Sequence, residues 1–521
     1  MKNIFLYKWQ VYIVGIIPLL LIFFFRDFTP ANELRYLSIA DEAINQGHFF
    51  AFYYHGLPYT DKPPLYIWLV MLSRLVGVEQ NMLDLGIFSV LPAFIVIYIM
   101  SRWIKNEVLE KYMLCGQYML ISTAYFIGAA LVIRMDMFMC MFIILSLYIF
   151  YKTYQDPGYR KGFWLFPLCM FVGLFIKGPL ALIFPIVSII AFLIVVRRPN
   201  YILKYLGWRL WIILFIFSGI WIFMAWMEGG DLYIHDLLVK QTLHRAVNAF
   251  HHQKPFYYYF MVIFYVLAPW ILFYISIIYL GIKRHLVDTD LKKFFLTVIV
   301  VVFVILSFIS SKVDIYMLPL IPFVTFFSIL ILPDVSHNKA IRWSLYIPFV
   351  IVSFAFPVYL VMSYYNNFLH DYVLYLAVAV LSASSFLSIM FLRNHKMIKS
   401  IECFSIGLFI CLFIGSFSLP RLNGYIGYRE LANKIEAVSS KNKITTTYTY
   451  RLKNGGDIRV YTNHPIIMLD ESTIGNVDIK DGKSLLVFPL KYIKHDSLLI
   501  SKIEGGRMIR VGNNAILLFD N

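Results

Sequence analysis

Long apolar runs recur along most of this chain, and charged or turn-forming residues separate them. A run of roughly 17 to 25 predominantly apolar residues is long enough for a helix to cross the hydrocarbon core of a membrane. We expect thirteen such helices, near residues 9–26, 83–103, 112–133, 136–151, 163–180, 181–197, 210–227, 257–281, 294–310, 315–332, 343–363, 372–392 and 402–419. The pattern therefore predicts a polytopic α-helical membrane domain that covers residues 1–420.

The pattern changes after Pro420, where the apolar runs become short and alternate with polar residues. One helix is expected over residues 428–438, followed by strands over 444–450, 458–461, 466–469, 485–488, 498–503, 508–511 and 515–519. Pairs that contain glycine indicate turns between these strands. Residues 421–521 are thus expected to form a separate, small α/β domain.

A polar segment, residues 27–82, lies between the first two apolar runs. Apolar positions over residues 34–44 recur at helical spacing opposite charged positions, and Gly47 follows them. This spacing predicts an amphipathic helix along the membrane interface, and a second short helix is expected after Pro63-Pro64. A further polar segment, residues 228–256, is expected on the same face of the membrane.

The composition excludes a soluble globular protein, because 60% of the 521 residues are hydrophobic and only 15% are charged. Basic residues gather in every second connection between the predicted helices. Short cytoplasmic loops retain lysine and arginine, so we expect a cytoplasmic N-terminus and an extracytoplasmic C-terminal domain. The net charge of +16 is then mainly a signal of topology, with attraction to membrane lipid as a second effect, and it does not indicate a nucleic-acid partner.

Charged residues stand at the expected outer ends of several helices, where an unpaired charge beside hydrocarbon is costly. The cations are Lys62, Arg134, Lys177, Arg245 and Lys312, and the acids are Glu33, Asp61, Asp136 and Asp314. Lys62 comes directly before the expected start of a helix, and a helix start beside a lysine is a favourable site for a phosphate. A cavity lined by these residues would suit an amphiphile with a phosphate head group.

Plainer interpretations stay open for some of these positions. Arg134 and Asp136 can be charges that mark a helix end, and Lys177 can be a lysine that extends its ammonium to the membrane surface. The second polar segment contains His244 and His251 near carboxylates, so it would either bind a divalent metal or carry solvated histidines. The histidine spacing matches no zinc signature and no glycine-rich phosphate loop is present, so the sequence requires no cofactor.

The charged motifs resemble those of a known enzyme family. Asn32-Glu-Leu-Arg-Tyr36 and Gly56-Leu-Pro-Tyr-Thr-Asp-Lys-Pro-Pro-Leu65 look like the first periplasmic loop of lipid-linked-sugar glycosyltransferases with the GT-C membrane fold. The similarity continues through Arg134-Met-Asp136, Lys177-Gly-Pro179, the Arg245 loop, Ala268-Pro-Trp270 and Lys312 to Pro319. The chain is similar to glycosyltransferase family 39, which includes the protein O-mannosyltransferases, and most similar to the aminoarabinose transferase branch of lipid A modification.

This resemblance implies that a sugar moves from a polyprenyl phosphate to a lipid or protein acceptor on the outer face of the bacterial inner membrane. Matching positions would assign the donor phosphate to Lys62, Lys177, Arg245, Lys312 and Tyr316. Arg35, Asp61 and Arg134 would shape the site or contact the acceptor. Direct displacement by the acceptor would invert the anomeric centre of the sugar.

Asn32 is the main departure from the family pattern, which usually has aspartate at this position. Asparagine is not a base at neutral pH, so Glu33 or Asp136 would take the acceptor proton unless the acceptor is already an anion. Two other functional classes stay open, a lipid or polysaccharide transporter and a non-catalytic membrane assembly factor. A transporter would be expected to show internal repeats and acidic residues at mid-helix depth.

Overall fold

The computed structural model describes residues 2–76, 82–238, 254–309, 312–462, 464–477 and 483–519. Contacts within the chain divide it into two compact units. The first unit contains Met1–Ile22, Thr60–Tyr66 and Gly86–Ser416, and the second contains Phe23–Tyr59, Ile67–Leu85 and Phe417–Asn521. The boundary between residues 420 and 421 stays a prediction, because a grouping of contacts does not test which segments fold independently.

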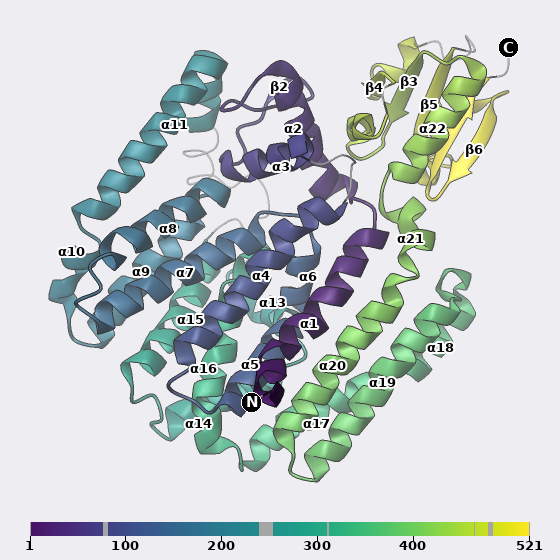
Figure 1. Ribbon diagram of the computed structural model, residues 1–521. Coiled ribbons are helices and arrows are strands. Elements are labelled where there is room, and N and C mark those ends of the chain that lie inside the picture. The colour runs from purple at the N-terminus through teal and green to yellow at the C-terminus, as the bar shows by residue number, and fades with distance from the viewer. Residues whose placement is uncertain are drawn as a thin grey trace. The chain divides into compact units, whose positions relative to one another are not determined.

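Helices build the first unit, as expected for apolar segments that must satisfy every backbone hydrogen bond within themselves. The helices that lie wholly or partly in it are α1 (Lys2–Phe25), α4 (Met82–Ile104), α5 (Glu110–Ile121), α6 (Ala124–Leu131), α7 (Asp136–Gln155), α8 (Gly162–Lys177), α9 (Leu180–Val195), α10 (Ile202–Tyr205), α11 (Trp208–His235), α13 (Tyr258–Val266), α14 (Ile271–Lys283), α15 (Asp290–Phe308), α16 (Leu320–Val335), α17 (Lys339–Ser353), α18 (Ala355–Tyr365), α19 (Tyr372–Arg393) and α20 (Met397–Ser416). Neighbours in sequence pack side by side, as α7 does with α8 and α19 with α20 (Figure 1).

Each of the thirteen predicted apolar segments lies on an apolar helix, but the number of thirteen membrane crossings is not confirmed. In the described part of the chain, eight helices are long and apolar enough to cross a membrane. The number rises to eleven if each of three bent helix pairs is one crossing. The remaining two predicted crossings coincide with the shorter apolar helices α8 and α9.

The break between α5 and α6 shows how a buried helix end is stabilised. The two helices meet at an angle of 61°. The hydroxyl of Thr123 donates to the carbonyl of Met119 at 2.8 Å, which satisfies a group that the broken helix leaves open. The hydroxyl of Ser122 donates to the carbonyl of Tyr118 at 2.5 Å, in addition to the bond from the Ser122 backbone N–H. The chain then continues through α6 to the turn that carries Arg134.

The second unit begins with the segment that follows α1. It contains a turn of π-helix, η1 (Pro30–Leu34), then α2 (Arg35–Gln46), the hairpin β1 (Tyr53–Tyr54) and β2 (Leu57–Pro58), and most of α3 (Leu65–Val76). Both short helices expected in this segment are confirmed. Gly47 ends α2 with a φ of 73°, a left-handed conformation that glycine adopts without strain.

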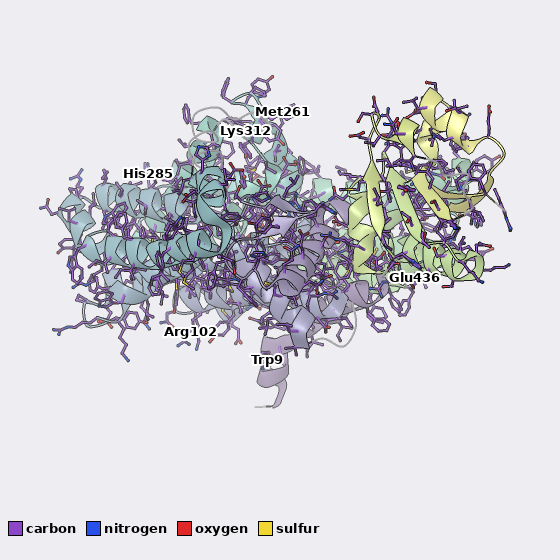
Figure 2. The ribbon with its side chains drawn as sticks, turned by 90° about the horizontal axis from the view of Figure 1, so that it is seen from above. Trp9, Arg102, Met261, His285, Lys312 and Glu436 are labelled. Atoms are coloured by element: carbon purple, nitrogen blue, oxygen red, sulfur yellow. The ribbon has the colours of Figure 1, made fainter. Side chains whose placement is uncertain are left out.

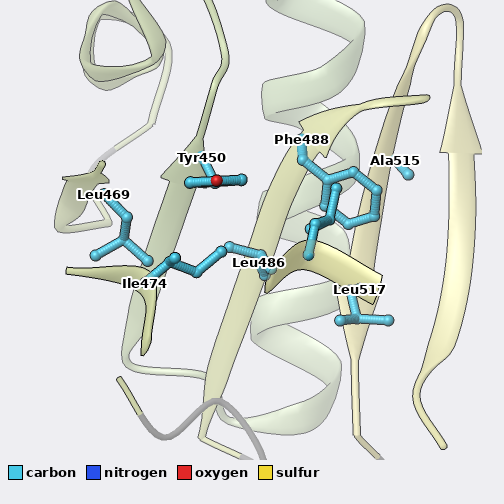
Figure 3. Close-up of a cluster of buried hydrophobic side chains, with 8 residues drawn as sticks. Tyr450, Leu469, Ile474, Leu486, Phe488, Ala515 and Leu517 are labelled. Carbon is cyan, nitrogen blue, oxygen red and sulfur yellow. The ribbon is translucent and has the colours of Figure 1, made fainter. Parts of the chain in front are cut away.

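The C-terminal residues form a five-stranded mixed sheet with helices α21 (Leu419–Ile426) and α22 (Arg429–Asn442) before it. The strands are β3 (Thr446–Tyr450), β4 (Ile466–Leu469), β5 (Ser484–Pro489), β6 (Arg507–Val511) and β7 (Asn514–Leu518), in the spatial order β4-β3-β5-β7-β6. β3 is parallel to β4 and β5, whereas β7 is antiparallel to β5 and β6. Buried Tyr450, Leu486 and Phe488 belong to its core (Figure 3).

Two of the predicted strands are wrong. Residues 458–461 lie mostly in a 3-10 helix, η6 (Gly455–Val460), and residues 498–503 lie in the helix α23 (Ser497–Ile503). Asp496 caps α23 by accepting a hydrogen bond from the backbone N–H of Leu499 at 3.1 Å. Short apolar runs fit a strand or a helix equally well, so a cap of this kind decides between them.

Candidate functional site

A buried acid, Asp136, stands at the start of α7 and faces two cations. Lys177, the last residue of α8, donates a hydrogen bond to Asp136 Oδ1, and Arg134 Nε lies 3.1 Å from Oδ2. Only 2% of the Asp136 side chain is exposed, against 7% for Lys177 and 32% for Arg134. The helices explain the encounter: α7 and α8 are antiparallel neighbours, so the N-terminus of one meets the C-terminus of the other. A carboxylate is favoured at the first and a lysine at the second.

The hydrogen bonds of Asp136 are incomplete. Its Oδ2 is buried, yet it accepts no hydrogen bond from the part of the chain that the structure describes. Lys62, which precedes α3 in the first polar segment, adds an electrostatic attraction to Asp136. One buried carboxylate thus faces three cations, and a site with this surplus of positive charge attracts an anion. Asp61, next to Lys62, is half-buried.

Tyr316 completes the surroundings of Lys177. It lies in the 3-10 turn η4 (Asp314–Met317), and its ring centre is 4.8 Å from Lys177 Nζ. A cation over an aromatic face gains about 0.5–2 kcal/mol, more when both are withdrawn from water. Lys177 is therefore held from two sides, by the Asp136 carboxylate and by this ring.

Lys312 and Asp314 do not pair with each other among the ion pairs of the described residues. Lys312 is 4% exposed and donates a hydrogen bond at 2.5 Å to the carbonyl of Ile309, which follows the end of α15. Asp314 instead accepts hydrogen bonds from the hydroxyls of Tyr258 and Tyr265. The buried ammonium of Lys312 stays close to a helix C-terminus, where its charge is favourable.

Four tyrosines of this region were not anticipated from the sequence. Besides Tyr258 and Tyr265, Tyr259 exchanges hydrogen bonds of 3.1 Å with the backbone of Val313. Tyr125, on α6, lies 6.1 Å from the ring of Tyr265 and interacts electrostatically with both Asp136 and Asp314. The run of three tyrosines at 257–259 was the available signal, since hydroxyls at a membrane boundary usually have a polar partner.

Glu33, in the second unit, is engaged in holding a turn. Its carboxylate accepts two hydrogen bonds from Arg26, at 2.6 and 3.1 Å, and two from the backbone N–H and hydroxyl of Thr29, both at 2.8 Å. These bonds close the turn η1. Asn32, in the same turn, is exposed, and the guanidinium of Arg35 lies over the rings of its neighbour Tyr36 and of Tyr59.

Asp27 joins the first polar segment to the C-terminal residues within the second unit. Its Oδ2 accepts a hydrogen bond from the backbone N–H of Arg429 at 2.8 Å, and so it caps α22 from a distant part of the chain. Its Oδ1 accepts from the hydroxyl of Tyr461 at 2.7 Å. Burial and the adjacent Asp27 carboxylate raise the pKa of Tyr461, so this hydroxyl keeps its proton and donates it.

Two further acids strengthen this junction. Glu42 accepts hydrogen bonds from the backbone of the β1–β2 turn at 2.8 and 2.9 Å and from Arg459 at 2.5 Å. Asp457, whose side chain is fully buried, contacts His55 Nε2 and accepts from the hydroxyl of Tyr54, both at 3.1 Å. The sequence pattern did not indicate the contacts of Asp457 with Tyr54 and His55 or of Arg459 with Glu42. The two residues of each contact are more than 400 positions apart.

The remaining predicted site residues lie outside the described part of the chain. These are Arg245, His244 and His251, all within residues 239–253. Among the described residues, no group of three or more His, Cys, Asp or Glu side chains could hold a metal ion. The metal prediction for the two histidines and the phosphate prediction for Arg245 therefore stay predictions.

No family model matches the chain. It is 24% identical to an uncharacterized protein of Aquifex aeolicus over 449 residues, 84% of each chain. It is 23% identical over 332 residues to the undecaprenyl phosphate-alpha-4-amino-4-deoxy-L-arabinose arabinosyl transferase of Shewanella sediminis, which covers 60% of this chain and 58% of that protein. A transferase of the same description from Sodalis glossinidius is 25% identical over 258 residues, 47% of this chain and 45% of that protein. The chain thus spans about half the length of the arabinosyl transferases that it matches.

Solved structures are similar over almost the whole chain. The crystal structure of ArnT from Cupriavidus metallidurans bound to undecaprenyl phosphate superposes with a TM-score of 0.78 at 13% identity, over 98% of this chain and 97% of that one. The same protein in the apo state gives a TM-score of 0.75 at 15% identity, with the same coverage. The predicted fold class, a polytopic GT-C membrane protein with a small C-terminal α/β domain, is confirmed. The chain is a multi-pass membrane protein with the fold of ArnT.

Proposed function

We propose that the chain is a membrane glycosyltransferase that moves a sugar from a polyprenyl-phosphate donor to a lipid acceptor. The observation that carries this proposal is the buried Asp136 among Arg134, Lys177 and Lys62, in a fold shared with a protein crystallised with undecaprenyl phosphate. The sequence similarity to arabinosyl transferases supports the same reaction. The donor that their names give, a sugar on undecaprenyl phosphate, fits a site of surplus positive charge.

The reaction that we propose needs a site for the leaving phosphate above all. The oxygen of an anionic acceptor, such as a lipid phosphate, bonds to the anomeric carbon while the bond from that carbon to the donor phosphate oxygen breaks. The polyprenyl phosphate leaves with the electron pair, and no proton has to be removed. Cations that offset its growing negative charge lower the barrier, as fixed charges do in other displacements. Lys62 and Lys177 are the proposed phosphate contacts, with Tyr316 keeping Lys177 in place and Lys312 as a further cation.

Asp136 is the proposed acid beside the acceptor. Glu33 already accepts four hydrogen bonds, so a proton transferred to it would weaken the bonds that close the turn η1. The charge of Asp136 is engaged by Lys177 and Arg134, which favours a role in holding these cations and orienting the acceptor through Oδ2, which accepts no hydrogen bond from the described residues. An acceptor that is itself an anion, such as a lipid phosphate, would require no base at Asn32.

We place this reaction on the outer face of a bacterial inner membrane. The basic connections between helices support a cytoplasmic N-terminus and an extracytoplasmic C-terminal domain. A GT-C protein of the ArnT type implies the inner membrane. Attachment of a reporter enzyme that is active only in the cytoplasm to residue 521 should give no signal, and strong reporter activity there would overturn this orientation.

Transfer can be measured with the purified full-length chain in proteoliposomes that contain undecaprenyl-phosphate aminoarabinose and lipid A, with mass spectrometry of the lipid product. Lys62→Ala and Asp136→Asn should each strongly reduce transfer, whereas Lys434→Ala, an exposed lysine of α22, should leave it unchanged. Transfer at the normal rate in both site variants would refute the enzyme proposal. NMR of the product tests the expected inversion, and a retained anomer would contradict direct displacement.

A further inference from the structure

A second site of positive charge lies where α4 and α7 end. A cavity of about 350 Å³ is lined there by three cations, Arg102 from the last turn of α4, Lys105 directly after α4, and Lys152 from the last turn of α7. All three side chains belong to exposed residues. The other lining residues are three aromatic and two amide side chains, so none is acidic.

This cavity is far from the Asp136 cluster. Asp136 is the first residue of α7, and Lys152 lies in the last turn of the same 20-residue helix. A helix of this length rises about 30 Å, which is the thickness of the hydrocarbon core. Figure 2 labels Arg102 and Lys312, and the two lie well apart in that view. The cavity therefore faces the opposite membrane surface and is not part of the proposed transfer site.

The cations of the cavity have no acidic partner among the ion pairs of the described residues. Two acids are nearby, Glu107 and Asp290, and both interact electrostatically with Tyr151. Asp290 is engaged elsewhere, because it accepts a hydrogen bond from Tyr154 at 2.8 Å.

A cavity in the second unit shows the contrast. It has a volume of about 340 Å³ and is lined by Arg26 and Arg429 but also by Asp27 and Glu430. Its own acids therefore offset its cations. The cavity at the end of α4 holds an excess of positive charge that an anion would neutralise.

Aromatic side chains give the cavity a firm wall. Trp103 is 8% exposed, and its ring centre lies 5.3 Å from that of Tyr148 and 5.8 Å from that of Tyr151. Its indole N–H has no hydrogen-bond partner in the described part of the chain. Aromatic rings beside cations are typical of the membrane interface, where acyl chains and charged head groups meet.

We propose that this cavity binds the phosphate of an anionic phospholipid in the leaflet opposite to the Asp136 cluster. Arg102, Lys105 and Lys152 would neutralise the phosphate, and Trp103 and Tyr148 would contact the glycerol and the first acyl carbons. Basic pockets between membrane helices bind anionic head groups in this way. Topology alone accounts for basic residues in a connection, but it does not require them to converge on one cavity with aromatic walls. The proposal is independent of the proposed sugar transfer.

The test compares two triple variants that lose the same charge. The cavity variant is Arg102→Gln, Lys105→Gln and Lys152→Gln. The matched control is Arg393→Gln, Lys396→Gln and Lys399→Gln, three exposed residues from the end of α19 to the first turn of α20. Native mass spectrometry of the full chain measures its affinity for phosphatidylglycerol added to phosphatidylcholine micelles. We expect the affinity to fall at least about tenfold in the cavity variant and to change little in the control. The reason is that each lysine or arginine near an anionic head group adds to the binding free energy.

Three outcomes would overturn the proposal. The first is that the cavity variant binds phosphatidylglycerol as tightly as the control variant does. The second is that phosphatidylcholine binds as tightly as phosphatidylglycerol. The third is that inorganic phosphate alone stabilises the chain against heat as much as phosphatidylglycerol does. A second measurement does not depend on the variants. Photoactivatable phosphatidylglycerol, added to the unaltered protein, should crosslink to peptides at the ends of α4 and α7, and crosslinking elsewhere only would also refute the site.

Discussion

Buried acids of the two units differ in the hydrogen bonds that they accept. In the second unit Asp27, Glu33 and Glu42 each accept several directed hydrogen bonds from backbone N–H groups and from side chains. In the first unit Asp136 faces cations at both oxygens, and its Oδ2 accepts no hydrogen bond from the described residues. A fully hydrogen-bonded acid is well suited to hold two segments together, whereas an acid with an oxygen that accepts no hydrogen bond, among several cations, is suited to receive a ligand.

This difference has a physical basis. A buried polar atom without a hydrogen bond costs about 1–3 kcal/mol, so such atoms are rare unless a function retains them. Glu33 and Asp136 carry the same charge and are both buried, at 1% exposure each. Their hydrogen bonds, and not their burial, separate a structural acid from a candidate for the transfer site.

Lys177→Ala should have the largest effect, because it removes the cation that bonds Asp136 and lies over Tyr316. We expect sugar transfer per folded protein to fall by about 10²–10³-fold, the scale seen when one group that stabilises a developing charge is removed. Turnover in proteoliposomes, normalised to protein that elutes as a single peak, measures this. Lys177→Arg is the matched control, and it should recover part of the activity because it restores the charge. Undiminished turnover in Lys177→Ala would remove the cluster from the mechanism.

Asp457→Ala should affect stability more than turnover. It leaves His55 and Tyr54 without their buried partner, and we expect a loss of about 2 kcal/mol. Burial and the Asp457 carboxylate raise the pKa of Tyr54, so in the unaltered protein its hydroxyl keeps its proton and donates a hydrogen bond. The midpoint of thermal unfolding measures the loss, with Glu471→Ala, an exposed acid paired with Arg451, as a control that should change little. Loss of transfer at an unchanged midpoint would contradict the structural role of this acid.

Glu33→Gln should have the smallest effect. Glutamine keeps an acceptor for Thr29 but loses the charge that attracts Arg26, which costs about 1 kcal/mol. We expect transfer to stay within a few-fold of the unaltered protein, in contrast to Asp136→Asn. If Glu33→Gln instead abolishes transfer while Asp136→Asn retains it, the comparison between the two acids is reversed, and Glu33 is the acid that transfer requires. Parallel initial rates of the two variants decide the matter.

The sequence indicated much of the fold because a membrane imposes local rules. The length of an apolar run predicts a helix without reference to its neighbours, and Gly47 marked the end of α2 in the same way. The strand predictions for residues 458–461 and 498–503 were wrong because no such rule relates the length of a short apolar run outside the membrane to one kind of element. Asp496 could be identified as a helix cap only after the helix α23 was known.

The candidate site was foreseen by residue type but not by partner. Lys62, Asp136, Lys177 and Tyr316 were named from motifs, and the structure brings them together in one unit. Asp314 was named among the charged residues of the cavity, but its partners Tyr258 and Tyr265 were not. A motif shows which residues carry charge, but the packing of helices selects which of them meet.

The sequence by itself determined the membrane class, the helical segments and the set of charged residues at helix ends, since each depends on local composition and on the solvent that surrounds it. Only the tertiary structure decided that Lys177 meets Asp136, 41 positions away, and that Asp27 caps α22, 402 positions away. Contacts between distant residues depend on the packing of whole elements, and no local pattern contains that information.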